Sequence, residues 1–117
     1  MSKIKFLLCV LIFCVFSISC GSNKKPSGIS DEVYQNAVYV VKATDLYLNG
    51  ESTIEDAYKK IDSVKDTDAE VASEDWGIEV SIQSIKTRCL GVKVGSNTLS
   101  DLKESRDELA KEINYKD

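Results

Sequence analysis

Residues 30–50 read SDEVYQNAVYVVKATDLYLNG, and this stretch decides the fold because it holds a complete helix with its own start and stop signals. Ser30 is a favoured N-cap residue, and acidic residues follow it in the first turn, where the helix dipole favours negative charge. Asn49-Gly50 is a stop signal. Apolar residues recur between them at spacings of three and four, which predicts a helix of about 19 residues. This stripe consists of Tyr34, Ala37, Val41, Thr44 and Leu48, widened by Val33, Val38 and Val40.

A second helix is predicted after a connection of about three residues, which is short enough to force an antiparallel hairpin. Its start carries two alternative capping pairs, Ser52 with Glu55 and Thr53 with Asp56. Its apolar face consists of Ile54, Ala57, Tyr58, Ile61 and Val64.

A third helix is predicted from about Val71 or Trp76 to Leu90, closed by Gly91 and Gly95. A short part of this segment would also suit a strand, but the longer match has helical spacing. The residues at that spacing are Ile78, Ile82, Ile85, Cys89 and Val92. We expect Trp76 to pack in the core or to plug one end of a hairpin.

A fourth helix is predicted to start at Thr98, with Asp101 at the capping-box spacing, and residues 114–117 are expected to fray. Its apolar stripe consists of Leu99, Leu102, Leu109 and Ile113. The Gly, Thr and Asp residues of this junction repeat those of the earlier one 45 residues before, through duplication of a hairpin or through common cap chemistry. The predicted fold is all-α: a small antiparallel bundle of two helical hairpins, with three to four helices.

The connection between the hairpins, residues 66–75, is acidic and superficially resembles a calcium loop. An EF-hand loop that began at Asp66 would need Gly at its sixth position and Glu at its twelfth. Val71 and Gly77 occupy these positions, so we expect a solvated connection and no metal site.

The chain begins with a basic segment containing Lys3 and Lys5, followed by the apolar run from Phe6 to Phe16 and then by small or apolar residues before Cys20. These are the parts of a secretory signal. The apolar run is too short to cross a bilayer, which takes about 20 apolar residues. The signal indicates export. An ordinary signal cut after Ser19 would leave Cys20 as a free thiol, and an uncleaved signal would itself serve as the anchor.

The sequence Ser-Ile-Ser-Cys at residues 17–20, followed by Gly-Ser-Asn, resembles the lipobox of bacterial lipoproteins. This resemblance implies a signal peptide at residues 1–19, which is cleaved, and a diacylglyceryl group on Cys20. Residues 20–29, rich in polar residues with Pro26 and Gly28, would then form a flexible tether, and residues 30–117 the helical domain. The protein would be lipid-anchored to the extracytoplasmic face of a cell membrane or outer membrane.

Composition excludes several classes of function. Removal of residues 1–19 leaves 13 basic and 19 acidic residues, a net charge of −6, which disfavours nucleic-acid binding. The sequence contains no histidine, and therefore lacks the commonest general base and the commonest metal ligand. Cys89 would be the single thiol of the lipidated domain, and its place on an apolar helical face predicts burial. We expect no enzyme activity and no cofactor.

Five tyrosines are many for a small domain, and Tyr39 and Tyr47 fall partly off the main apolar stripe. Exposed tyrosines can anchor a protein contact, so these two are candidate contact residues, although tyrosines at the margin of a core are an equally simple explanation. We therefore expect a non-enzymatic binding module for a protein or envelope component. Alternative hypotheses are an immunity or exclusion lipoprotein against a toxin, bacteriocin or phage, and an accessory subunit of an exported enzyme.

Overall fold

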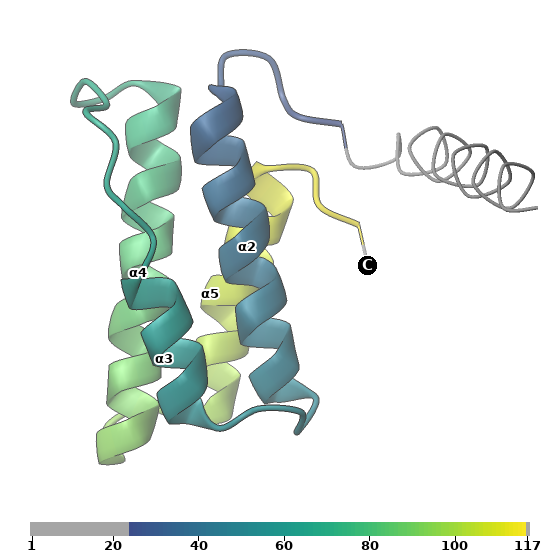
Figure 1. Ribbon diagram of the computed structural model, residues 1–117, viewed down its shortest axis with the longest axis vertical. Coiled ribbons are helices and arrows are strands. Elements are labelled where there is room, and N and C mark those ends of the chain that lie inside the picture. The colour runs from purple at the N-terminus through teal and green to yellow at the C-terminus, as the bar shows by residue number, and fades with distance from the viewer. Residues whose placement is uncertain (1–23, 117) are drawn as a thin grey trace, which may run out of the picture.

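Four helices make up the part of the chain that the computed structural model describes, residues 24–116. They are α2 (Asp31–Leu48), α3 (Ile54–Asp62), α4 (Glu74–Val94) and α5 (Leu99–Glu112). Successive helices run in alternating directions, so that α2 and α4 both begin at the end of the bundle where the chain enters (Figure 1). The prediction of a small antiparallel helical bundle is confirmed. The predicted signal peptide and Cys20 lie outside the described residues.

Each helix begins at a side chain that accepts a hydrogen bond from the first turn. Ser30 caps α2 by accepting from the Val33 N–H, and Ser73 caps α4. Thr53 caps α3 by accepting from the Asp56 N–H at 3.1 Å, so this pair provides the cap rather than Ser52 with Glu55. Such caps satisfy backbone donors that a helix leaves unpaired at its start.

The junction before α5 carries a complete capping box, in which Thr98 and Asp101 each accept a hydrogen bond from the other's N–H. Thr98 accepts from the Asp101 N–H at 3.2 Å, and the Asp101 carboxylate accepts from the Thr98 N–H at 2.9 Å. Gly50 and Gly95, which precede the two threonine caps, are both left-handed, with φ of 77° and 83°. The two junctions that resemble each other in sequence therefore also share their local geometry.

The core lies along the bundle axis and is formed by the predicted stripes of the four helices, except Leu99, which is 54% exposed. Trp76, predicted to lie in the core or at one end of a hairpin, is 39% exposed and lies outside the core. Both occur in the first turn of a helix, at the margin of the bundle, where packing neighbours are few. The largest fully buried side chains are Ile61, Ile85, Leu102, Leu109, Ile113, Val33, Val40, Val41, Thr44 and Cys89.

Helix α4 is longer than predicted, because it continues through Gly91 and ends at Val94. The carbonyl of Gly91 accepts hydrogen bonds from the N–H groups of Ser96 and Asn97 in the following turn. A Cβ at position 91 would lie 1.8 Å from Asn97 Oδ1, so the position requires glycine to admit this turn. The helix stops instead at Gly95, which adopts the left-handed conformation common at helix ends.

The segments at both ends of the domain are packed. Ile29 is buried in the core, and the Ser30 N–H donates to Asp75 at 2.8 Å, so the packed unit begins one residue before Ser30. At the other end, the Tyr115 N–H donates to the Ala110 carbonyl at 2.8 Å, and its side chain packs against the core. The expected fraying does not occur at Tyr115. No helix within residues 24–116 is both long and apolar enough to cross a membrane.

Candidate functional site

An open groove of about 940 Å³ lies between the C-terminal part of α2 and α5. Its walls combine apolar side chains with charges of both signs. It is lined by Asp45, Leu48, Asn49, Leu99, Ser100, Lys103, Arg106, Asp107 and Tyr115. Because α2 ends and α5 begins at the end of the bundle opposite the entering chain, the groove extends toward that far end (Figure 1).

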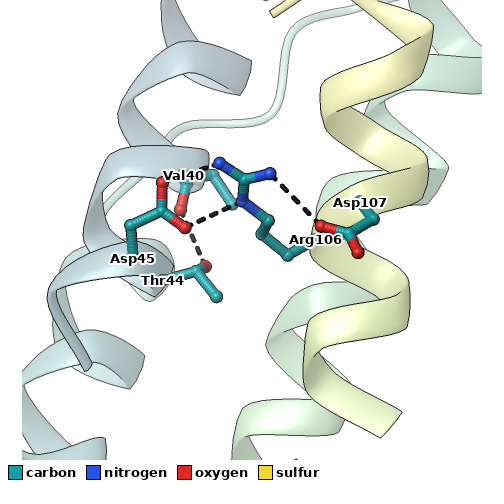
Figure 2. A network of polar contacts seen from close by, with 5 residues as sticks. All are labelled: Val40, Thr44, Asp45, Arg106 and Asp107. Carbon is teal, nitrogen blue, oxygen red and sulfur yellow. Dashed lines mark hydrogen bonds and ion pairs between the residues drawn. The ribbon is translucent and has the colours of Figure 1, made fainter. Parts of the chain in front are cut away.

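The charged base of the groove is an ion pair between Asp45 on α2 and Arg106 on α5, shown in Figure 2. Arg106 donates from Nε and Nη2 to the two carboxylate oxygens of Asp45, each at 2.8 Å. Such bidentate pairs are stronger and more directional than single charged hydrogen bonds. Arg106 is only 8% exposed, and its Nη1 donates to Asp107 at 3.2 Å.

The surroundings of this ion pair give it a structural role. The Arg106 guanidinium lies 5.7 Å from the centre of the Tyr115 ring, a favourable distance for a cation–π contact. Next to Asp45, the buried Thr44 hydroxyl donates to the Val40 carbonyl of its own helix at 2.8 Å. Both oxygens of Asp45 are engaged by one permanently charged partner, so the pair clamps α5 to α2 and shapes the groove.

Asp45 and Arg106 were not among the predicted site residues, although the sequence contains a signal for both. Asp45 falls four residues after Val41 and three before Leu48, and therefore on the predicted apolar stripe. Arg106 likewise falls between Leu102 and Leu109 on the stripe of its helix. One acidic and one basic residue on two apolar stripes would have indicated a pair across the helix interface.

The two candidate contact tyrosines lie on α2 but differ in environment. Tyr39 is 45% exposed, with exposed Gln35 and Lys42 one turn to either side. Tyr47 is half-buried and packs against the core. They are eight residues apart, about 12 Å along the helix, and the rotation between them is about 80°. Tyr39 alone therefore offers an exposed aromatic ring, and the two do not form one patch.

The outward face of α4 carries a second group of apolar side chains, which we call the outer stripe. Its apolar members are Trp76, Val80, Leu90 and Val94, which are 39%, 47%, 44% and 70% exposed. The exposed polar residues Gln83 and Thr87 lie between them on the same face. The outer stripe is opposite the core-facing residues of α4, so this helix is apolar on two sides.

No protein-family model, curated protein or solved structure matches this chain. A function for this chain can therefore be proposed only from its sequence and from the surfaces of residues 24–116.

Cys89 is fully buried in the core, as predicted, and within residues 24–116 it forms no disulfide. Burial raises the pKa of its thiol from 9.0 to about 11, because the apolar surroundings disfavour the charged thiolate. The thiolate is the nucleophilic form of cysteine. Cys89 is therefore protonated at neutral pH and contributes to packing.

The acidic connection is held by hydrogen bonds to α4. Glu79 accepts from both the N–H and the hydroxyl of Thr67, the first at 2.7 Å, and the Gln83 amide donates to Asp66 at 3.3 Å. Within residues 24–116, no three Cys, Asp or Glu side chains gather in a way that could hold a metal ion. The carboxylates of this region instead anchor the connection to the helix.

Proposed function

We propose that this chain is a lipid-anchored, non-enzymatic binding protein on the extracytoplasmic face of a bacterial cell membrane or outer membrane. The observation that carries the proposal is the lipobox-like sequence from Ser17 to Cys20 at the end of a basic and apolar leader. A diacylglyceryl group supplies two acyl chains, which suffice for stable anchoring, whereas one chain binds a bilayer only marginally.

The packing of Ile29 supports a short tether. Residues 20–28 remain between the proposed lipid and the core, and a flexible chain of nine residues would have an end-to-end distance of about 15–18 Å. The end of the bundle where α2 begins would therefore lie near the bilayer. The groove between α2 and α5 would open about 27 Å farther out, the length of an 18-residue helix. A partner arriving from outside would reach the groove before the membrane.

The lining of the groove favours a protein partner. Leu48, Leu99 and Tyr115 offer apolar contact, while Lys103 and Asp107 offer charges of opposite sign. Apolar contact bordered by polar groups is the usual composition of a protein interface. A peptide loop with one apolar side chain between polar residues would fit this lining.

The anchor is tested by the intact mass and membrane partition of the expressed wild-type chain and of Cys20→Ala. The expected result is a diacylglyceryl mass on Cys20 and a membrane-bound wild type, with Cys20→Ala unmodified and released from the membrane. A wild-type chain that is cleaved but carries no lipid would contradict the anchor and would identify a secreted domain.

The groove is tested by placing a photo-crosslinking amino acid at Leu99 in the membrane-bound chain. The matched control carries the same amino acid at Glu108, which is exposed on the outer face of α5. We expect one discrete crosslinked partner from position 99 that is lost when Lys103→Glu is added. Equal crosslinking from positions 99 and 108 would contradict binding in the groove.

A further inference from the structure

The outer stripe of α4 is unexplained by packing within the chain. Its residues follow one another in steps of four and three, in the order Trp76, Val80, Gln83, Thr87, Leu90 and Val94. This is the heptad spacing of a coiled-coil seam. The seam positions called a hold Val80, Thr87 and Val94, which are all β-branched, and the alternate positions called d hold Trp76, Gln83 and Leu90. Among parallel coiled coils, β-branched residues at a with leucine at d favour two strands over three or four.

We infer that α4 pairs through its outer stripe with α4 of a second copy of this chain, in parallel orientation. Each residue of the stripe would then face its own counterpart. Val80, Leu90 and Val94 would form apolar layers toward both ends, and Thr87 would meet Thr87 of the second copy, hydroxyl to hydroxyl. A surface that meets itself across a two-fold axis must be self-complementary, and this stripe satisfies that condition.

The residues flanking the outer stripe support this pairing. One flank carries Gly77, Ser84 and the Asn97 side chain that covers Gly91, none of which is charged, and the other carries Glu79, Lys86 and Lys93. In a parallel pair each flank faces the opposite flank of the other copy, so charged residues face uncharged ones and like charges do not meet. Lys86 is moreover already paired with Asp62 of its own chain at 2.6 Å.

A protein partner fits the outer stripe better than a lipid surface does. Glu74 and Asp75 precede Trp76 at one end, and Gln83 and Thr87 lie in the middle. Hydrocarbon leaves buried polar groups unsatisfied, and anionic headgroups repel carboxylates. A second helix can accept and donate hydrogen bonds at Thr87, while Gln83 also keeps its contact with Asp66 in its own chain.

Parallel pairing also agrees with the lipid anchor, although it does not depend on it. Because α2 and α4 begin at the same end of the bundle, both copies of α2 in a parallel pair would begin at one end (Figure 1), so the two proposed lipids can enter one bilayer. The outer stripe spans 19 residues, about 28 Å of helix, which is short for a coiled coil. We therefore expect weak association that confinement to a membrane increases through effective concentration.

The test uses the full chain in membranes with Thr87→Cys, followed by mild oxidation and non-reducing electrophoresis. Thiols at facing a positions lie close enough for a disulfide, which needs Cβ atoms about 3.5–4.5 Å apart. The control is Lys103→Cys, which is exposed on α5 away from the stripe. The unsubstituted chain gives the background from its native cysteines, of which Cys89 is buried. We expect a disulfide-linked dimer from Thr87→Cys only.

A second substitution separates pairing from chance collision. Leu90→Glu, added to Thr87→Cys, introduces facing charges one turn away and is expected to reduce the dimer about tenfold, as for an energetic loss of 1.4 kcal/mol. Its circular dichroism spectrum should be unchanged, because Leu90 is exposed. Adding Cys20→Ala distinguishes this inference from the anchor: the dimer should then require a higher protein concentration but still form.

Three results would overturn the inference. Equal dimer yields from Thr87→Cys and Lys103→Cys would show random collision. A disulfide that forms only when Gln83→Cys and Thr87→Cys are combined would show antiparallel pairing, in which these two positions face each other. A thiol at position 87 that is shielded from a water-soluble maleimide without forming a dimer would show that the stripe lies on the bilayer.

Discussion

At the scale of single residues, the domain depends on a few side chains whose chemistry departs from that of their neighbours. Arg106 is a charged group in the interface between two helices, and its partner Asp45 comes from the other helix. Cys89 is a titratable group among aliphatic side chains. The strength of such an ion pair and the pKa of such a thiol depend on the side chains around them, so both properties report on the packing.

The Asp45–Arg106 pair gives the first prediction. Asp45→Ala should lower the free energy of unfolding by about 2–4 kcal/mol, because it leaves a buried guanidinium without its main acceptor. Asp45→Leu combined with Arg106→Met should recover most of that loss, since the remaining charge is also removed. Urea denaturation followed by circular dichroism measures both. If the double variant were as unstable as the single one, the pair would not be the cause.

The Cys89 thiol gives the second prediction, on pH dependence. Its pKa is raised from 9.0 to about 11 by burial, so the folded state keeps a proton that the unfolded state releases. The stability that this proton contributes is present below pH 9 and is lost as the pH rises toward 11. The free energy of unfolding of the wild type should therefore fall more steeply between pH 9 and 11 than that of Cys89→Ala. Parallel curves from urea denaturation would contradict this.

At the scale of elements, capping pairs set the start of each helix and glycines serve two different purposes. Gly95 ends α4 through its left-handed conformation, whereas Gly91 lies within the helix and makes room for Asn97. Glycine is thus favoured at position 95 by the left-handed backbone and at position 91 by the close packing of Asn97.

The glycines of α4 provide a matched pair of substitutions. Gly77→Ala meets nothing within 4 Å and should stabilise the domain by about 0.5–1 kcal/mol, the difference in helix propensity. Gly91→Ala should instead destabilise it by roughly 1–2 kcal/mol, because Asn97 must move and give up its hydrogen bond to Asp101. Thermal unfolding of the two variants side by side measures the difference in sign. Stabilisation by both substitutions would show that the turn after α4 can rearrange around Asn97 without loss of stability.

At the scale of the whole molecule, helices α2 to α5 enclose one core, and the residues that flank them at Ile29 and Tyr115 pack in or against that core. Ile29 precedes α2 and Tyr115 follows α5, yet both contact the core. Because Ile29 belongs to the core, any tether to the membrane would have to end before residue 29. The groove between α2 and α5 and the outer stripe of α4 lie on different parts of the surface.

The role of Ile29 gives the fourth prediction. Ile29→Ala should lower the free energy of unfolding by about 2–4 kcal/mol, the usual loss for truncating a buried aliphatic side chain. Val71→Ala is the control, because Val71 is 77% exposed in the connection before α4, and it should change stability by less than about 0.5 kcal/mol. Urea denaturation compares them. Equal small effects would place Ile29 in the tether.

The sequence by itself determined the all-α class, the Ser30 and Thr98 caps that start α2 and α5, and the burial of Cys89, because capping and apolar spacing act over a few neighbouring residues. The Thr98–Asp101 pair and the α2 stripe are clear instances. Only the tertiary structure decided that α4 continues past Gly91, that Ile29 joins the core and that Asp45 meets Arg106 across 61 residues of chain. These features depend on how the helices pack side by side, and local spacing carries no information about which side chains from distant segments will meet.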